Sequence, residues 1–235
     1  MTTSTISPDQ TVGTIAAERP ASVRVFEKYK IDFCCGGRIP LTEACSRTGA
    51  DPLAVLADLE QAGVSVPDDT DWQTAKITSL IDHIVAKHHA YLQSELPRLE
   101  AMLEKLLTKH SEAHGDVLVP LLGIFRELRD ELLPHLMKEE MILFPLIRQL
   151  DAGDKRAHHC GSVQNPLRVM FMEHDAAGAA LVHMRELTSG FTAPPDACNT
   201  YRACFYELAE LESDLHRHIH LENNILFPRA VALES

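Results

Sequence analysis

The sequence predicts an all-α protein, with an antiparallel four-helix bundle over about residues 74–235 and a small helical domain at residues 1–66. Three observations predict this fold. Strand signals are scarce, because few stretches alternate between apolar and polar residues. Leu, Ala, Glu and His dominate the segments in which apolar residues recur at helical spacing. A His-x3-Glu motif also occurs twice, each time inside such a segment.

The N-terminal part differs in composition from the rest. Residues 11–30 and 41–62 predict short helices on either side of residues 31–38, Ile-Asp-Phe-Cys-Cys-Gly-Gly-Arg. Residues 67–73 are rich in turn-forming residues and predict a linker between two domains.

Four long periodic segments follow the linker. They predict helices at about residues 74–109, 117–150, 165–189 and 195–231. Asn165-Pro166 and Pro194-Pro195-Asp196 supply start signals for the third and fourth helices. Short links inside each pair and a polar connection between the pairs indicate two helical hairpins.

The duplicated motif lies on the second and fourth of these helices. His135 precedes Glu139 and His218 precedes Glu222 at the same spacing, and both copies are followed by Phe-Pro. Residues four apart on a helix share one face, so each pair aims an imidazole and a carboxylate at the same point.

Both copies continue an apolar seam read in steps of three and four. The two seams are Leu121, Phe125, Leu128, Leu132, His135, Glu139 and Ile142, and Cys204, Leu208, Leu211, Leu215, His218, Glu222 and Ile225. A bare carboxylate in a bundle core is strongly destabilising, and metal coordination makes it tolerable. An exposed ion pair explains one copy alone; the repetition within two apolar seams favours a two-metal site.

A single histidine precedes each motif on the neighbouring helix. His89 and His174 lie at similar distances before His135 and His218. The predicted metal ligands are therefore His89, His135, Glu139, His174, His218 and Glu222. If each carboxylate bridges, every metal receives two nitrogens and two oxygens, and a bridging oxide or hydroxide leaves one open position. A nitrogen and oxygen set without thiolate suits iron or manganese better than structural zinc.

Other polar residues carry weaker signals. Glu131 and Asp214 lie four residues before a predicted ligand and are candidates for orienting an imidazole, although a surface position is equally compatible. His158-His159-Cys160 could bind a metal adventitiously. The remaining histidines lie off the ligand pattern, which predicts ordinary, mostly exposed positions: His83, His88, His110, His114, His183, His216 and His220. Cys45, Cys160, Cys198 and Cys204 lack the spacing of a metal site among themselves.

Cys34 and Cys35 form a second candidate site, for redox or iron-transfer chemistry. Adjacent Cα atoms lie about 3.8 Å apart, shorter than the usual disulfide separation, so free or reversibly oxidised thiols are expected. The following glycines leave room for the backbone, and Arg38 could favour a thiolate. A pair of small buried residues at a tight turn is the alternative.

Charge and hydropathy exclude several classes of function. A formal net charge of −12 without a run of Lys or Arg argues against a nucleic-acid partner. No apolar stretch approaches the roughly 18 residues of a membrane span, and the first residues lack the basic and apolar regions of a signal peptide. The sequence therefore predicts a cytoplasmic protein whose six cysteines stay mostly reduced.

The combination of these motifs resembles a known family. Asp-Phe-Cys-Cys-Gly-Gly in a short N-terminal domain, followed by Met-Lys-Glu-Glu-x-Ile-Leu-Phe-Pro and Leu-Glu-Asn-Asn-x-Leu-Phe-Pro, is similar to the RIC proteins over about residues 10–232. The resemblance implies a haemerythrin-like bundle with a non-haem di-iron centre on the six ligands named above. It places the family's cysteine pair on Cys34 and Cys35.

The resemblance also implies a function. RIC proteins are di-iron proteins of nitrosative and oxidative stress that help to repair damaged iron–sulfur clusters, with damaged iron–sulfur proteins as recipients of iron. The alternative is binding or reduction of nitric oxide at the di-iron centre. An oxygen carrier is a more distant possibility, because the four-histidine set differs from the five-histidine site of such carriers.

Overall fold

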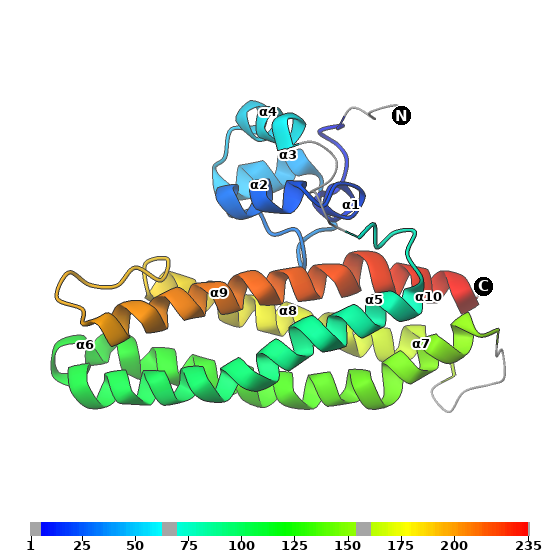
Figure 1. Cartoon of the computed structure of the whole chain (residues 1–235). Helices are drawn as coiled ribbons and strands as arrows, with labels where there is room; N and C mark the ends of the chain where they lie inside the picture. The colour runs from blue at the N-terminus through cyan, green and yellow to red at the C-terminus, as the bar shows by residue number, and fades with distance from the viewer. Residues whose placement is uncertain (1–5, 63–69, 154–160, 235) are drawn as a thin grey trace. The chain divides into compact units, whose positions relative to one another are not determined.

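The computed structural model describes residues 6–62, 70–153 and 161–234, and the regular elements of these residues are all helices (Figure 1). The predicted all-α class is therefore confirmed. Contacts divide the chain into two compact units, one of residues up to Leu80 with His216–Leu233 and one of Ile81–Leu215. Within the described ranges, none of the helices combines the length and apolarity that a bilayer crossing requires.

The N-terminal part of the first unit contains four short helices. Each predicted helical region contains two of them: α1 (Val12–Glu18), α2 (Ser22–Tyr29), α3 (Leu41–Thr48) and α4 (Pro52–Ala62). Thr11 caps α1, because its hydroxyl accepts a hydrogen bond from the Thr14 N–H. The rings of Phe26 and Phe33 stack at 6.1 Å in the core of these helices.

The C-terminal helices belong to the same unit. They comprise the end of α9 (Asn199–Leu221), η3 (Glu222–Leu226) and most of α10 (Phe227–Glu234). The Arg229 guanidinium donates to the carbonyls of Trp72 and Ala75, each at 2.6 Å, and so ties α10 to the segment before α5 (Ile77–His83).

The second unit contains the long helices. Its elements are η1 (Ile84–His89), α6 (Ala90–Lys138), η2 (Glu139–Leu143), α7 (Phe144–Asp151), α8 (Gln164–Leu187) and most of α9, and the long ones are α6, α8 and α9. The chain reverses direction inside α6, at His114, where φ is −134° and ψ is 21°. The two halves of α6 therefore correspond to the predicted first and second helices.

Ion pairs link the four long segments into a ring, each segment bonded to two neighbours. Glu100–Arg126 joins the two halves of α6, Arg98–Glu207 joins the first half to α9, Arg185–Glu212 joins α9 to α8, and Glu173–His135 joins α8 to the second half of α6. Figure 1 shows these segments running alongside one another. This is the arrangement of a four-helix bundle.

The apolar seams face the interior of the bundle, with one shift in phase. Leu121, Phe125, Leu128 and Leu132 are buried as expected. Ile142 is wrong as a seam residue, because it is 55% exposed while the next two residues, Leu143 and Phe144, are buried. The cause is η2, a π-helix, whose turn holds about one residue more than an α-helical turn and rotates everything after it.

Candidate metal centre

Three of the predicted ligands stand where an α-helix changes into a π-helix or back. His89 is the last residue of η1, Glu139 is the first of η2, and Glu222 is the first of η3. π-helical turns are rare and often lie at functional sites, because the extra residue re-aims the side chains around it. The sequence carries no signal for π-helical turns, so the prediction of ordinary helices missed all three of them.

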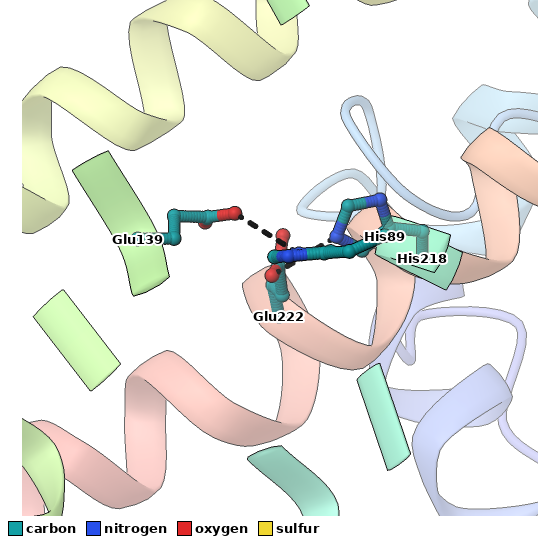
Figure 2. Close-up of side chains that lie close together, drawn as sticks. All are labelled: His89, Glu139, His218 and Glu222. Carbon is teal, nitrogen blue, oxygen red and sulfur yellow. Dashed lines mark ion pairs between the residues drawn. The ribbon is translucent and has the colours of Figure 1, made fainter. Parts of the chain in front are cut away.

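Six buried side chains form two groups with ligand atoms close enough to hold a cation. One group is His89, Glu139, His218 and Glu222; the other is His135, Glu139, His174 and Glu222. Within each group the ligand atoms lie within 4.8 Å of one another. In Figure 2, Glu139 extends from one side toward the other three members of the first group, which are His89, His218 and Glu222.

Both carboxylates belong to both groups, whereas each imidazole belongs to one. His135 Nε2 lies 3.1 Å from His174 Nε2, and His218 Nε2 lies 3.1 Å from Glu222 Oε1. Each group therefore offers two imidazole nitrogens and two carboxylate oxygens, the set that two cations sharing two carboxylates would use.

Glu139 tests whether these residues fit a cation. Its side chain is 0% exposed, and neither carboxylate oxygen has a hydrogen-bond partner in the described part of the chain. The nearest nitrogens, Nε2 of His89 and of His135, each lie 3.4 Å from Oε2. That distance suits two ligands of one ion better than a hydrogen bond. A buried carboxylate in this state needs a positive charge, so the residues fit a cation.

Two further carboxylates orient the imidazoles. His89 Nδ1 lies 2.8 Å from Glu140 Oε1, and His135 Nδ1 lies 2.7 Å from Glu173 Oε2. An N–H at Nδ1 that donates to a carboxylate leaves the lone pair at Nε2 directed at the ligand group. Glu131, one of the two candidates for this role in the sequence, is exposed on α6.

Glu173 is held in its ionised form. Burial alone would raise its pKa, but hydrogen bonds from Lys138 and His135 outweigh burial and lower the pKa. Lys138 Nζ also forms an ion pair with Glu173 Oε1. An ionised Glu173 is the stronger acceptor for the His135 N–H.

Two histidines predicted to be ordinary surface residues are buried. His88 Nδ1 lies 2.9 Å from Asp214 Oδ1, so Asp214 contacts His88 rather than a predicted ligand. Burial lowers the pKa of His220 to about 4, and a hydrogen bond to the Phe33 backbone opposes this shift. Residues 158–160, the possible adventitious site, lie outside the described residues.

Asp32 organises the turn that holds Cys34 and Cys35. Its Oδ1 accepts hydrogen bonds from the backbone N–H groups of Cys34 (2.9 Å) and Cys35 (3.0 Å), and its Oδ2 accepts one from Gly36 (2.8 Å). Position 37 requires glycine, because a Cβ there would lie only 2.6 Å from the Phe33 carbonyl oxygen. The tight turn is therefore fixed by one carboxylate and a close backbone approach.

The two thiols differ in environment. Cys34 is buried, with Sγ 3.3 Å from Asp32 Oδ1 and 3.7 Å from Cys35 Sγ, whereas Cys35 is half-buried. Burial, with the neighbouring Cys35 and Asp32, raises the pKa of Cys34 well above its usual range. The expectation that this turn favours a thiolate is thus wrong for Cys34. Neither cysteine forms a disulfide within the described ranges.

The two residues that follow Glu222 donate hydrogen bonds to the turn that holds Cys34 and Cys35. Asn223 Nδ2 donates to the Cys34 carbonyl at 3.3 Å, and Asn224 Nδ2 donates to the Phe33 carbonyl at 3.1 Å. The Asn224 amide also lies 3.0 Å from His220 Nδ1. The cysteine turn and the η3 segment that begins with Glu222 are therefore joined by side-chain amides.

Replacing Asn224 by alanine is expected to loosen the turn. Loss of a partly buried hydrogen bond costs about 1 kcal/mol, which corresponds to roughly a fivefold rise in transient opening. We expect Cys34 to react about fivefold faster with a thiol reagent, followed by mass spectrometry of labelled peptides. Buried Cys45 serves as the internal reference, and Asn199→Ala, an exposed asparagine, as the control. An unchanged Cys34 rate would mean that the amide contacts do not hold the turn.

Comparison with known protein families gives two matches along the chain. Residues 8–63 match ScdA_N, described as a domain of unknown function (DUF542). Residues 80–230 match the haemerythrin HHE cation-binding domain. The second match covers the long helices and all six residues of the two buried groups.

Full-length relatives are also found. The iron–sulfur cluster repair protein YtfE of Citrobacter koseri is 38% identical over 228 residues, which is 96% of this chain and 98% of the relative. The protein of the same name from Cronobacter sakazakii is 39% identical, and that from Escherichia coli O157:H7 is 38% identical, with the same coverage. With its haemerythrin-like four-helix bundle and small helical N-terminal domain, the chain belongs to the family of the iron–sulfur cluster repair protein YtfE.

Proposed function

We propose that His89, His135, Glu139, His174, His218 and Glu222 hold two non-haem iron ions. The observation that carries this proposal is the pair of buried four-residue groups that share both carboxylates. Nitrogen and oxygen donors without a thiolate suit iron, and the match to a cation-binding haemerythrin domain supports the same class of site. A bridging oxide or hydroxide completes the proposed centre.

In this centre the shared carboxylates hold the two positions together. Glu139 and Glu222 would be ligands at both positions, and one imidazole pair would belong to each position. Glu140 and Glu173 keep Nε2 of His89 and His135 directed inward. When bound, iron supplies redox chemistry and an open coordination position for a small molecule such as nitric oxide or oxygen.

We propose that the protein takes part in repair of damaged iron–sulfur clusters in the cytoplasm, and that it supplies iron to them. The support is that its full-length relatives, which match along both domains, are iron–sulfur cluster repair proteins. Damaged iron–sulfur proteins are the proposed recipients. Cys34 and Cys35 are proposed to act in redox or iron transfer, because their turn is tied to the segment that begins with Glu222.

Iron transfer is the direct test of this function. Protein loaded with isotopically labelled iron is mixed with an apo iron–sulfur protein, sulfide and a reductant, with and without nitric oxide. We expect labelled iron to move to the recipient and its cluster absorption to return. Iron that stays on the protein while nitric oxide is consumed would overturn iron donation and support nitric oxide chemistry instead.

The metal content gives a separate prediction. Protein purified without oxygen should contain about two irons per chain, since two groups of ligands are present. The apo form should also melt at a lower temperature, because buried carboxylates lose their counter-charge when the metal leaves. The measurement is metal analysis by mass spectrometry with calorimetry of both forms. A single zinc per chain in place of the two irons, or equal melting temperatures, would contradict the proposed centre.

A further inference from the structure

A second cluster of metal-ligating side chains lies within the unit of long helices, apart from the six residues described above. It contains His110 and His114, at the reversal inside α6, and Asp196 and Cys198, just before α9. The sequence pattern indicated no role for any of the four. The fold brings them together because the reversal of α6 meets the connection between α8 and α9, as Figure 1 shows for these segments.

The four side chains form two close pairs of ligand atoms. Cys198 Sγ lies 3.4 Å from His110 Nε2, and Asp196 Oδ2 lies 3.1 Å from His114 Nε2. Bonds of zinc to nitrogen, oxygen and sulfur of about 2.0–2.3 Å in tetrahedral geometry place neighbouring ligand atoms roughly 3.3–3.6 Å apart. Both pairs are therefore close to the spacing of two ligands on one ion.

The imidazole rings of His110 and His114 both pack against the ring of Tyr201. The rings of His110 and His114 meet the Tyr201 ring edge-on, with centroids 5.5 and 5.7 Å away and interplanar angles of 80° and 79°. Tyr201 is 1% exposed, so it is a fixed part of the core. Each Nε2 faces its polar partner rather than the core. The imidazoles are thus presented together.

In the described part of the chain the two pairs are separate, because their ligand atoms do not form a group within 4.8 Å of one another; binding of one ion therefore requires the side chains to rotate. The centroids of the His110 and His114 rings are 6.3 Å apart. Asp196 has a side chain that is 65% exposed, and Cys198 is exposed as well, so both can turn without disturbing the core. The non-helical backbone at His114 also frees its side chain from ideal helical geometry.

We propose that His110, His114, Asp196 and Cys198 form a binding site for a divalent metal ion of the zinc class. Two imidazoles, one thiolate and one carboxylate are the mixed ligand set that zinc accepts in tetrahedral sites. The ion displaces the thiol proton of Cys198 to solvent on binding. It links the reversal of α6 to the segment before α9, and this site is independent of the proposed iron centre.

Cobalt(II) provides the test, because a cobalt–thiolate bond gives a charge-transfer absorption that nitrogen and oxygen ligands do not give. Iron-loaded, full-length protein carrying Cys34→Ala, Cys35→Ala and Cys160→Ala is titrated with cobalt. The three substitutions remove the thiols of the N-terminal turn and of His158-His159-Cys160 as competing ligands. We expect one cobalt per chain with thiolate absorption, which zinc then displaces. Cys198→Ser should abolish the absorption, and His110→Ala or His114→Ala should weaken binding about tenfold or more.

His183→Ala is the matched control, since His183 is an exposed histidine on α8. It should bind cobalt as the parent does. Circular dichroism and iron content check that each variant is folded. Absence of thiolate absorption in the parent, or its persistence in Cys198→Ser, would show that the four residues form two separate hydrogen-bonded pairs and would overturn the proposal.

Discussion

Glu139→Ala is expected to abolish stable iron binding at both positions, and Glu222→Ala is expected to do the same. Each carboxylate belongs to both buried groups, so its loss removes a ligand from two ions at once. An imidazole variant such as His218→Ala removes a ligand from one group only and should spare part of the metal. We expect iron content to fall from about two per chain to well under one for either glutamate variant, measured by metal analysis.

The controls for this experiment come from the same helix. Glu131→Ala should leave the iron content unchanged, because Glu131 is exposed on α6. Glu140→Ala, although it changes the residue next to Glu139, is not neutral: Glu140 Oε1 lies 2.8 Å from His89 Nδ1. Its loss should weaken iron binding by about 10- to 100-fold, which is the usual effect of removing a partner that orients a metal-binding histidine. Full iron in Glu139→Ala would mean that the shared carboxylate is not a ligand.

The positions of the helices, and the inward-facing side of the helices that carry the ligands, could be predicted from the sequence because both follow from periodicity. An apolar seam in steps of three and four defines the face of a helix that turns inward, and His135 and Glu139 lie in that seam. The reversal at His114 lies between the two predicted helices. These features are local, so one stretch of sequence contains the information.

Contacts between distant segments could not be predicted in this way. Glu140 should point about a quarter turn away from Glu139, yet it reaches His89 on a neighbouring helix. The π-helical turn that begins at Glu139 changes the phase, and no residue pattern marks such a turn. His220 is buried because it meets Phe33, at a ring distance of 5.5 Å, nearly the whole chain away in sequence.

The cysteine turn illustrates the same limit. Cys34-Cys35-Gly36-Gly37 predicted a tight turn without a disulfide between the two cysteines, and neither cysteine forms one in the part of the chain that the structure describes. The pKa of Cys34 is raised, because its thiol is buried and lies beside Cys35 and Asp32. Proximity of Arg38 in the sequence predicted the opposite direction, because sequence distance does not measure burial.

Replacing Cys34 and Cys35 together by alanine is expected to leave iron content normal and to slow cluster repair about tenfold or more. Neither cysteine is in the two buried groups, so the double variant keeps every proposed iron ligand. The thiols lie 3.7 Å apart in a turn that Asn223 and Asn224 tie to the segment beginning with Glu222, which supports their proposed role in iron or electron transfer. The measurement is the rate of cluster restoration in a damaged iron–sulfur protein, with iron content determined in parallel.

Single variants separate the roles of the two thiols. Cys35 is half-buried and Cys34 is buried with a raised pKa, so Cys35 is the thiol that a recipient or reagent can reach. Cys35→Ala should therefore lower the repair rate nearly as much as the double variant, and Cys34→Ala should lower it less. Cys45→Ala, a buried cysteine on α3, is the control and should repair normally. If the double variant repairs clusters at the normal rate with normal iron, the cysteines are structural, and the iron centre alone carries the function.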